Sequence, residues 1–129
     1  MANVVLSAEQ REQLAMDIFK WLVDHKLWVD VQIYFNGKCW STCNKDHTEF
    51  CYNENRYFEY KAEPNDYFEW VREPNILSMS FEGGLYDVLN GYVSGWVRLE
   101  AEFKKIFEKY GLYFELGNAW NLSCFELYK

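Results

Sequence analysis

Hydrophobic side chains near the start of the chain recur at helical spacing. Leu14 and Ile18 belong to this pattern, which is typical of the buried face of an amphipathic helix. Ser7, followed three residues later by Gln10, forms a capping box, a common N-terminal signal of helices. We therefore predict a helix over about Ala8–Asp24.

A two-residue alternation then replaces the helical spacing. Trp28–Phe35 is rich in β-branched and aromatic residues, which favours a strand. The dipeptide Asn36-Gly37 follows, and it is the strongest short signal for a type I′ hairpin. Lys38–Thr42 is then the predicted return strand, and the polar, turn-rich segment Cys43–Asn55 is a predicted loop.

The rest of the chain mixes strand and helix patterns. Further strands are predicted over Arg56–Glu63, Ile76–Glu82, Leu112–Leu116 and Leu122–Tyr128. A helix capped by Ser94 is predicted to extend to Tyr110, with Gly111 as its left-handed C-terminal cap. The pattern of Tyr67–Arg72 fits either a short helix or a strand.

These elements predict an α+β fold with two layers. Hairpin connections favour a mostly antiparallel sheet of about five to six strands, with an N-terminal helix and a longer helix in the C-terminal half. Half of the 129 residues are hydrophobic, which is ample for one core. No linker or low-complexity stretch divides the chain, so we expect a single domain over residues 1–129.

The formal net charge of −7 is unevenly distributed. From Asp46 to Glu102 there are twelve acidic and four basic residues, a balance of −8, and the remaining residues carry eight acids and nine bases, a balance of +1. Such a chain should be repelled by phosphate backbones and anionic membranes. We therefore expect neither direct nucleic-acid binding nor membrane association. Because Met1–Gln10 has no secretion-signal pattern, we expect a cytoplasmic location and reduced cysteines.

Aromatic residues are interleaved with eight acidic residues within Asp46–Glu73. Alternation on a half-buried strand sends Tyr57 and Glu59 to the face opposite Phe58 and Tyr60. Tyrosine and tryptophan on a surface often anchor protein interfaces, and carboxylates around them select a basic partner. The predicted binding residues are Tyr57, Glu59, Glu63, Asp66, Tyr67, Glu69, Trp70 and Glu73. A solvated acidic face with amphipathic tyrosines is the alternative interpretation.

Four residues with metal-binding side chains follow one another at equal spacing. The series Cys39, Cys43, His47 and Cys51 offers the ligand types that zinc prefers, but its three-residue gaps differ from the two-residue gaps of zinc knuckles and ribbons. We therefore predict no metal site and expect these cysteines to pack as small hydrophobic residues. A thiol nucleophile activated by His25 or His47 is an alternative, although no family signature surrounds any of the cysteines.

Gly83-Gly84 stands between a predicted strand and a predicted helical turn, which is the position of phosphate-binding loops. The surrounding sequence has no third glycine and no Lys-Ser/Thr pair, and Glu82 would repel phosphate. We interpret the two glycines as a turn and predict no cofactor.

Together these features favour a small acidic binding protein without catalytic activity. Its hypothesised partner is a basic protein, in particular a nucleic-acid-handling protein whose basic groove it would occupy as an inhibitor. Small acidic inhibitors of restriction or CRISPR systems have a similar composition. The alternatives are a small enzyme with a Cys/His or carboxylate site, and a homo-oligomeric module such as a homodimer. A cleft that holds His47 with a cysteine would favour the enzyme, whereas clustered carboxylates on one surface would favour the binding protein.

Overall fold

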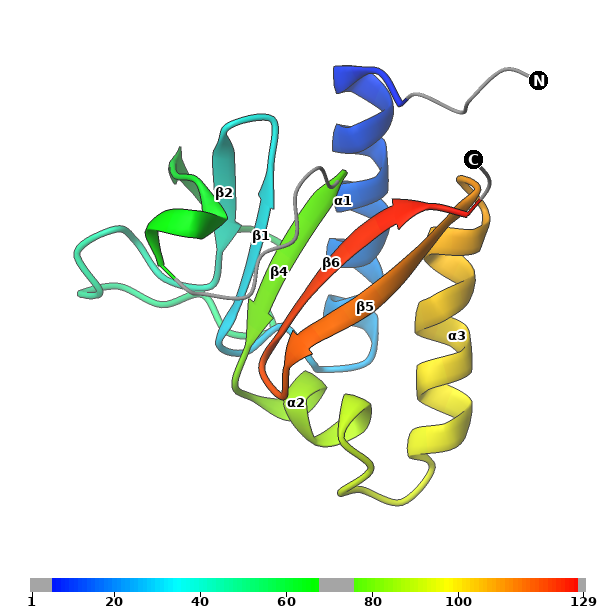
Figure 1. Ribbon diagram of the computed structural model, residues 1–129. Helices are drawn as coiled ribbons and strands as arrows, with labels where there is room; N and C mark the ends of the chain where they lie inside the picture. Colours follow the sequence, from blue (N-terminus) through cyan, green and yellow to red (C-terminus); the bar gives the residue numbers. More distant parts are fainter. Residues whose placement is uncertain (1–5, 68–75, 128–129) are drawn as a thin grey trace.

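Two helices lie side by side against one face of a six-stranded sheet (Figure 1). The computed structural model describes residues 6–67 and 76–127. The helices are α1 (Ala8–Asp24), the short α2 (Gly84–Leu89), α3 (Trp96–Glu108) and the 3-10 helix η1 (Pro64–Asp66). The strands are β1 (Val31–Phe35), β2 (Lys38–Ser41), β3 (Phe58–Lys61), β4 (Leu77–Phe81), β5 (Leu112–Asn118) and β6 (Asn121–Glu126).

Every neighbouring pair in the sheet is antiparallel, and the strand order is β3-β2-β1-β4-β6-β5. The predicted α+β class and its mostly antiparallel sheet are confirmed. The last strand, β6, lies inside the sheet between β4 and β5. Within the described residues, no helix combines the length and the apolar character needed to cross a bilayer.

The core lies between the sheet and the two long helices. Val31 and Ile33 of β1 are fully buried together with Ile18 and Leu22 of α1. These positions recur at two-residue spacing on the strand and at helical spacing on the helix, so each element buries one side. On the other side of the sheet, a second and smaller cluster buries Tyr34, Cys39 and Ala62.

The first hairpin forms as predicted. Asn36 and Gly37 both have positive φ values, 51° and 75°, which is the requirement of a type I′ turn. Phe35 then pairs directly with Lys38. The Asn-Gly signal therefore fixes the register of β1 against β2.

Several element boundaries differ from the predictions, and two of the differences have a clear cause in the backbone. The first strand begins at Val31 rather than Trp28, because Asp30 has a left-handed φ of 54° that interrupts extended backbone. Helix α3 is capped by Gly95, with a φ of 79° and no side-chain cap, rather than by Ser94. Gly111 has the predicted left-handed backbone, with a φ of 74°. The ambiguous segment Tyr67–Arg72 lies, from residue 68 onward, outside the described residues.

Candidate functional site

The face of the sheet opposite α1 and α3, here called the open face, carries polar side chains on its central strands. Gln32 of β1 alternates with the core residues and so points away from the helices. The Ser80 hydroxyl donates to Gln32 Oε1 at 2.7 Å, and Gln32 Nε2 donates to Ser41 Oγ at 3.2 Å. Farther along the sheet, the Ser78 and Ser123 hydroxyls lie 2.7 Å apart. These hydrogen bonds satisfy the polar side chains on this face of the sheet and fix their orientation.

A hollow of about 270 Å³ opens on this face. Its polar floor includes Gln32 and Ser80, and its walls come from the start of β1, the end of β4, the loop after β2, and the β5–β6 turn. Segments from distant parts of the sequence therefore build one site.

Aromatic rings form much of the wall. Tyr34 is buried, and its ring centroid lies 5.9 Å from that of Tyr67, which is 52% exposed. Phe50 on the rim is 48% exposed, and Tyr60 and Trp120 are also part of the lining. Burial raises the pKa of the Tyr34 and Tyr60 hydroxyls, so both remain neutral at physiological pH. The hollow thus offers flat apolar surfaces at its mouth.

Two carboxylates line the hollow on adjacent strands. Asp30 precedes β1 and Glu82 follows β4, one step beyond the paired residues Val31 and Phe81. The Glu82 amide donates to the Asp30 carbonyl at 3.1 Å, so the two positions continue the β1–β4 pairing.

The Asp30 carboxylate is also held by a neighbouring tyrosine. The Tyr52 hydroxyl donates to Asp30 Oδ1 at 2.5 Å, and this bond raises the pKa of Tyr52 to about 12. Among the described residues that line the hollow there is no lysine or arginine. Among residues 6–67 and 76–127, neither Asp30 nor Glu82 forms an ion pair. The hollow is therefore electronegative and suited to a cation.

A thiol and an imidazole meet at the same hollow. Cys43 Sγ lies 3.4 Å from His47 Nδ1 and 3.4 Å from the Ser41 hydroxyl oxygen. A tight turn brings the two together, because Asn44 accepts a hydrogen bond from the His47 amide at 3.0 Å and His47 has a φ of 58°. This pair has the geometry from which a thiol nucleophile could be built.

The other two cysteines of the spaced series make different contacts, and Cys39 packs in a buried cluster with Tyr34 and Tyr60, which line the hollow. Cys39 is buried beside Tyr34, and burial raises the pKa of its thiol to about 12. Cys51 donates to the Arg56 carbonyl at 3.4 Å. In the part of the chain that the structure describes, no three His, Cys, Asp or Glu side chains form a group suited to a metal ion. All four thiols are free.

The predicted binding residues are dispersed by the fold. Tyr57 stacks on Trp40, with ring centroids 4.1 Å apart, and Glu59 accepts a hydrogen bond from Trp40 Nε1 at 2.7 Å. Because Trp40 belongs to the core, both residues lie on the helix-covered side of β3. Tyr57 is half-buried there, although the alternation of the sequence favoured exposure.

The remaining predicted residues lie beyond β3. Glu63 lies next to the first hairpin at Gly37, and Asp66 is exposed in η1. Of the eight predicted residues, the structure places Tyr67 in the hollow. Glu69, Trp70 and Glu73 lie outside the described residues.

Sequence reasoning missed Asp30, Glu82 and Trp120 as site residues. The sequence placed Asp30 and Glu82 inside predicted strands, whereas the structure places both directly beyond a strand end, and Trp120 lies in the β5–β6 turn. Their proximity depends on β1 pairing with β4 and β4 pairing with β6. No local signal predicts those pairings.

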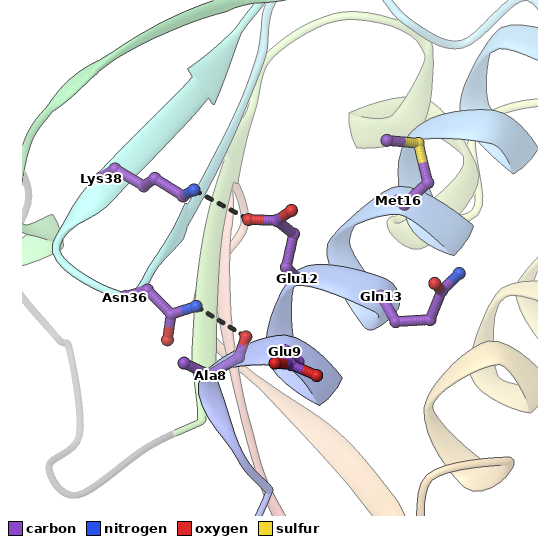
Figure 2. A pocket seen from close by; sticks show the side chains of 7 residues that line it. All are labelled: Ala8, Glu9, Glu12, Gln13, Met16, Asn36 and Lys38. Atoms are coloured by element: carbon purple, nitrogen blue, oxygen red, sulfur yellow. Dashed lines mark hydrogen bonds and ion pairs between the residues drawn. The ribbon is translucent and has the colours of Figure 1, made fainter.

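A second groove of about 380 Å³ separates the start of α1 from the first hairpin (Figure 2). Its charged and polar groups bind one another: Lys38 Nζ lies 2.9 Å from Glu12 Oε1, and Asn36 Nδ2 donates to the Ala8 carbonyl at 2.9 Å (Figure 2). These contacts join the helix to the hairpin. The open-face hollow, whose two carboxylates form no ion pair within the described part of the chain, is therefore the stronger candidate site.

Comparison with protein-family models, with curated proteins and with solved structures finds no significant match. Function is therefore inferred from the geometry of the open face.

Proposed function

We propose that this protein is a small acidic binding protein that uses its open sheet face to bind a basic protein. The observation that carries the proposal is the electronegative hollow, which combines Asp30 and Glu82 with exposed aromatic side chains at its mouth. Aromatic anchors supply apolar contact area at protein interfaces, and complementary charge speeds encounter and selects the partner. The net charge of −7 adds a long-range attraction for a basic partner.

A nucleic-acid-handling protein fits this partner class. Its binding groove concentrates lysine and arginine side chains that otherwise neutralise phosphates. An acidic protein seated over such a groove would exclude the nucleic acid. The proposed biological consequence is inhibition.

Salt-dependent capture with matched variants tests the proposal. The wild-type protein is immobilised and exposed to native cytosol at low and high salt, beside the double variant Asp30→Asn/Glu82→Gln. The control Asp24→Asn/Glu108→Gln makes the same charge change at exposed positions on the helices. We expect the wild type and the control to retain the same basic protein at low salt and the hollow variant to lose it. Equal capture by all three proteins would contradict the proposal.

The captured protein then allows the inhibitory role to be tested directly. Binding of nucleic acid to that protein is measured with increasing amounts of wild type or hollow variant. Competition by the wild type and not by the variant is expected. If a ternary complex forms instead, the groove is not the binding site and inhibition by occupation is excluded.

A thiol-dependent enzyme is the second candidate, because the hollow holds His47 beside Cys43, the arrangement expected of an enzyme, while the predicted carboxylates are dispersed. Such an enzyme would use the imidazole to accept the thiol proton before nucleophilic attack. Alkylation of the native protein with iodoacetamide, followed by peptide mass spectrometry, tests this. We expect Cys43 to react before Cys39 and Cys124, which are fully buried and whose pKa values burial raises to about 12. An unchanged alkylation rate in His47→Ala would eliminate the imidazole as a base.

A further inference from the structure

We propose that the open-face hollow is a cage for the guanidinium group of one arginine side chain presented by the partner. This inference rests on the proposed function and names the chemistry of its central contact. The hollow, at about 270 Å³, is sized for a single side chain rather than a folded element. The occupant is therefore a projecting residue of the partner.

The aromatic wall favours a flat cation. Tyr67 and Phe50 are about half exposed at the mouth, and Trp120 lines the hollow from the β5–β6 turn. An isolated exposed ring is common on protein surfaces, but here several rings surround one acidic depression. A guanidinium group stacks on such faces and is attracted by the negative potential above the rings.

The two carboxylates supply the charge and the hydrogen-bond acceptors. Asp30 and Glu82 occupy opposed positions at the ends of β1 and β4, and neither is neutralised by an ion pair within the described residues. Like charges opposite each other in a sheet repel. A cation placed between them removes that repulsion, and the five N–H donors of arginine can reach both groups at once.

The floor of the hollow explains why a cation, rather than a neutral polar ligand, is expected. Gln32 and Ser80 are already hydrogen-bonded to each other, and Gln32 also donates to Ser41. Their directional bonding capacity is largely used within the sheet. The carboxylates on the wall retain free acceptor sites, so the strongest attraction is for a donor with positive charge.

A titration followed by nuclear magnetic resonance tests the cage. The ¹⁵N-labelled wild-type protein is titrated at low ionic strength with N-acetyl-arginine methylamide, and with the lysine analogue as the comparison. We expect saturable shifts at the Asp30 and Glu82 amides and at the Trp120 indole N–H. The lysine analogue should bind about tenfold more weakly, because it lacks the planar fork.

Two variants and the matched control sharpen the test. Asp30→Asn/Glu82→Gln should weaken arginine binding by about tenfold or more, and Tyr67→Ala should weaken it to a smaller extent. Asp24→Asn/Glu108→Gln, with the same net charge as the hollow variant, should bind as the wild type does. The cage is overturned if no saturable shift occurs at the hollow, or if the control and the hollow variant lose the same affinity.

The outcome is separable from that of the proposed function. If partner capture requires Asp30 and Glu82 but arginine produces no shift at the hollow, the cage is wrong and the binding role stands. If arginine binds the hollow but capture does not depend on these carboxylates, the cage stands and the proposed function fails.

Discussion

The negative charge of Glu82 should destabilise the fold, although it contributes to the proposed binding surface. Its carboxylate lines the same hollow as Asp30 and has no ion-pair partner among the described residues. We predict that Glu82→Gln increases the free energy of unfolding by about 0.5 kcal/mol, because it removes a like-charge pair across two strands. Urea denaturation measures the change. This increase in unfolding free energy should be smaller at high salt, which screens the repulsion. A decrease would show that the Glu82 carboxylate makes a stabilising interaction.

Two adjacent glycines should tolerate alanine very differently. A Cβ atom at Gly83 would lie 2.4 Å from the Val29 carbonyl oxygen, whereas one at Gly84 would meet the end of the flexible Leu27 side chain at 2.8 Å. We predict that Gly83→Ala lowers the free energy of unfolding by roughly 1–3 kcal/mol, because backbone atoms must move. Thermal unfolding of this variant is compared with that of Gly84→Ala, which requires only a side-chain shift. Equal losses would contradict this account.

The sequence predicted some residue positions correctly and could not place others. It put Tyr57 and Glu59 on the face of β3 opposite Phe58 and Tyr60, and register in the structure agrees, since Glu59 opposes the core residue Trp40. Alternation, however, does not say which face a helix will cover. Tyr57 therefore packs on Trp40 and not on an exposed surface.

At the scale of the element, the start of α1 depends on its capping box. Ser7 Oγ accepts the Gln10 amide at 3.1 Å, and Gln10 Oε1 accepts the Ser7 amide at 2.9 Å. We predict that Ser7→Ala lowers the free energy of unfolding by about 1 kcal/mol. Ser7→Asp, which retains an acceptor at the cap, should remain close to the wild type in the same denaturation experiment. If both variants lost equal stability, the cap bond would not be the cause.

The contact between α1 and the end of α3 should make stability depend on acid. The Tyr110 hydroxyl donates to Asp17 Oδ2 at 2.6 Å, and Lys109 Nζ lies 3.1 Å from the same atom. Burial tends to raise the pKa of Asp17, but these hydrogen bonds outweigh it and hold the pKa below its ordinary value of 3.8. The stabilisation is therefore complete above the unfolded-state pKa and is lost as pH falls through the lower folded-state pKa.

Asp17→Asn tests this linkage. We predict a loss of about 1 kcal/mol at neutral pH and a weaker dependence of the unfolding free energy on pH in the acid range. Tyr110→Phe, which keeps the ion pair with Lys109, should lose less. An acid dependence identical to that of the wild type would assign the effect to other carboxylates.

Elements marked by local sequence signals, such as a helix cap or a turn dipeptide, were predictable. Features that depend on pairing between strands distant in the sequence were not. Helix α1 has the predicted bounds because its cap and its hydrophobic spacing agree. The first hairpin follows from Asn36-Gly37. The left-handed backbone at Asp30 and Gly95 was missed because the residues around them also fit a strand or a serine cap, and these local preferences compete.

At the scale of the whole molecule, counting charge along the sequence differs from mapping it in space. The segment Asp46–Glu102 holds the excess of acids, yet Asp30, which lines the hollow, lies outside that segment. Pairing of β1 with β4 brings it to Glu82. The charge balance of a sequence segment therefore indicates that the protein is acidic, but it does not locate the surface where a basic partner would bind.

The position of β6 has a consequence for synthesis on the ribosome. Because β6 bridges β4 and β5, the strands made earlier cannot close the sheet by pairing among themselves. A nascent chain that still holds residues 121–126 inside the exit tunnel should keep one margin of β4 unpaired and stay sensitive to protease. Protection from protease should then arise in one late step, when those residues emerge. Arrested chains of increasing length would therefore show an abrupt rather than a gradual onset of folding.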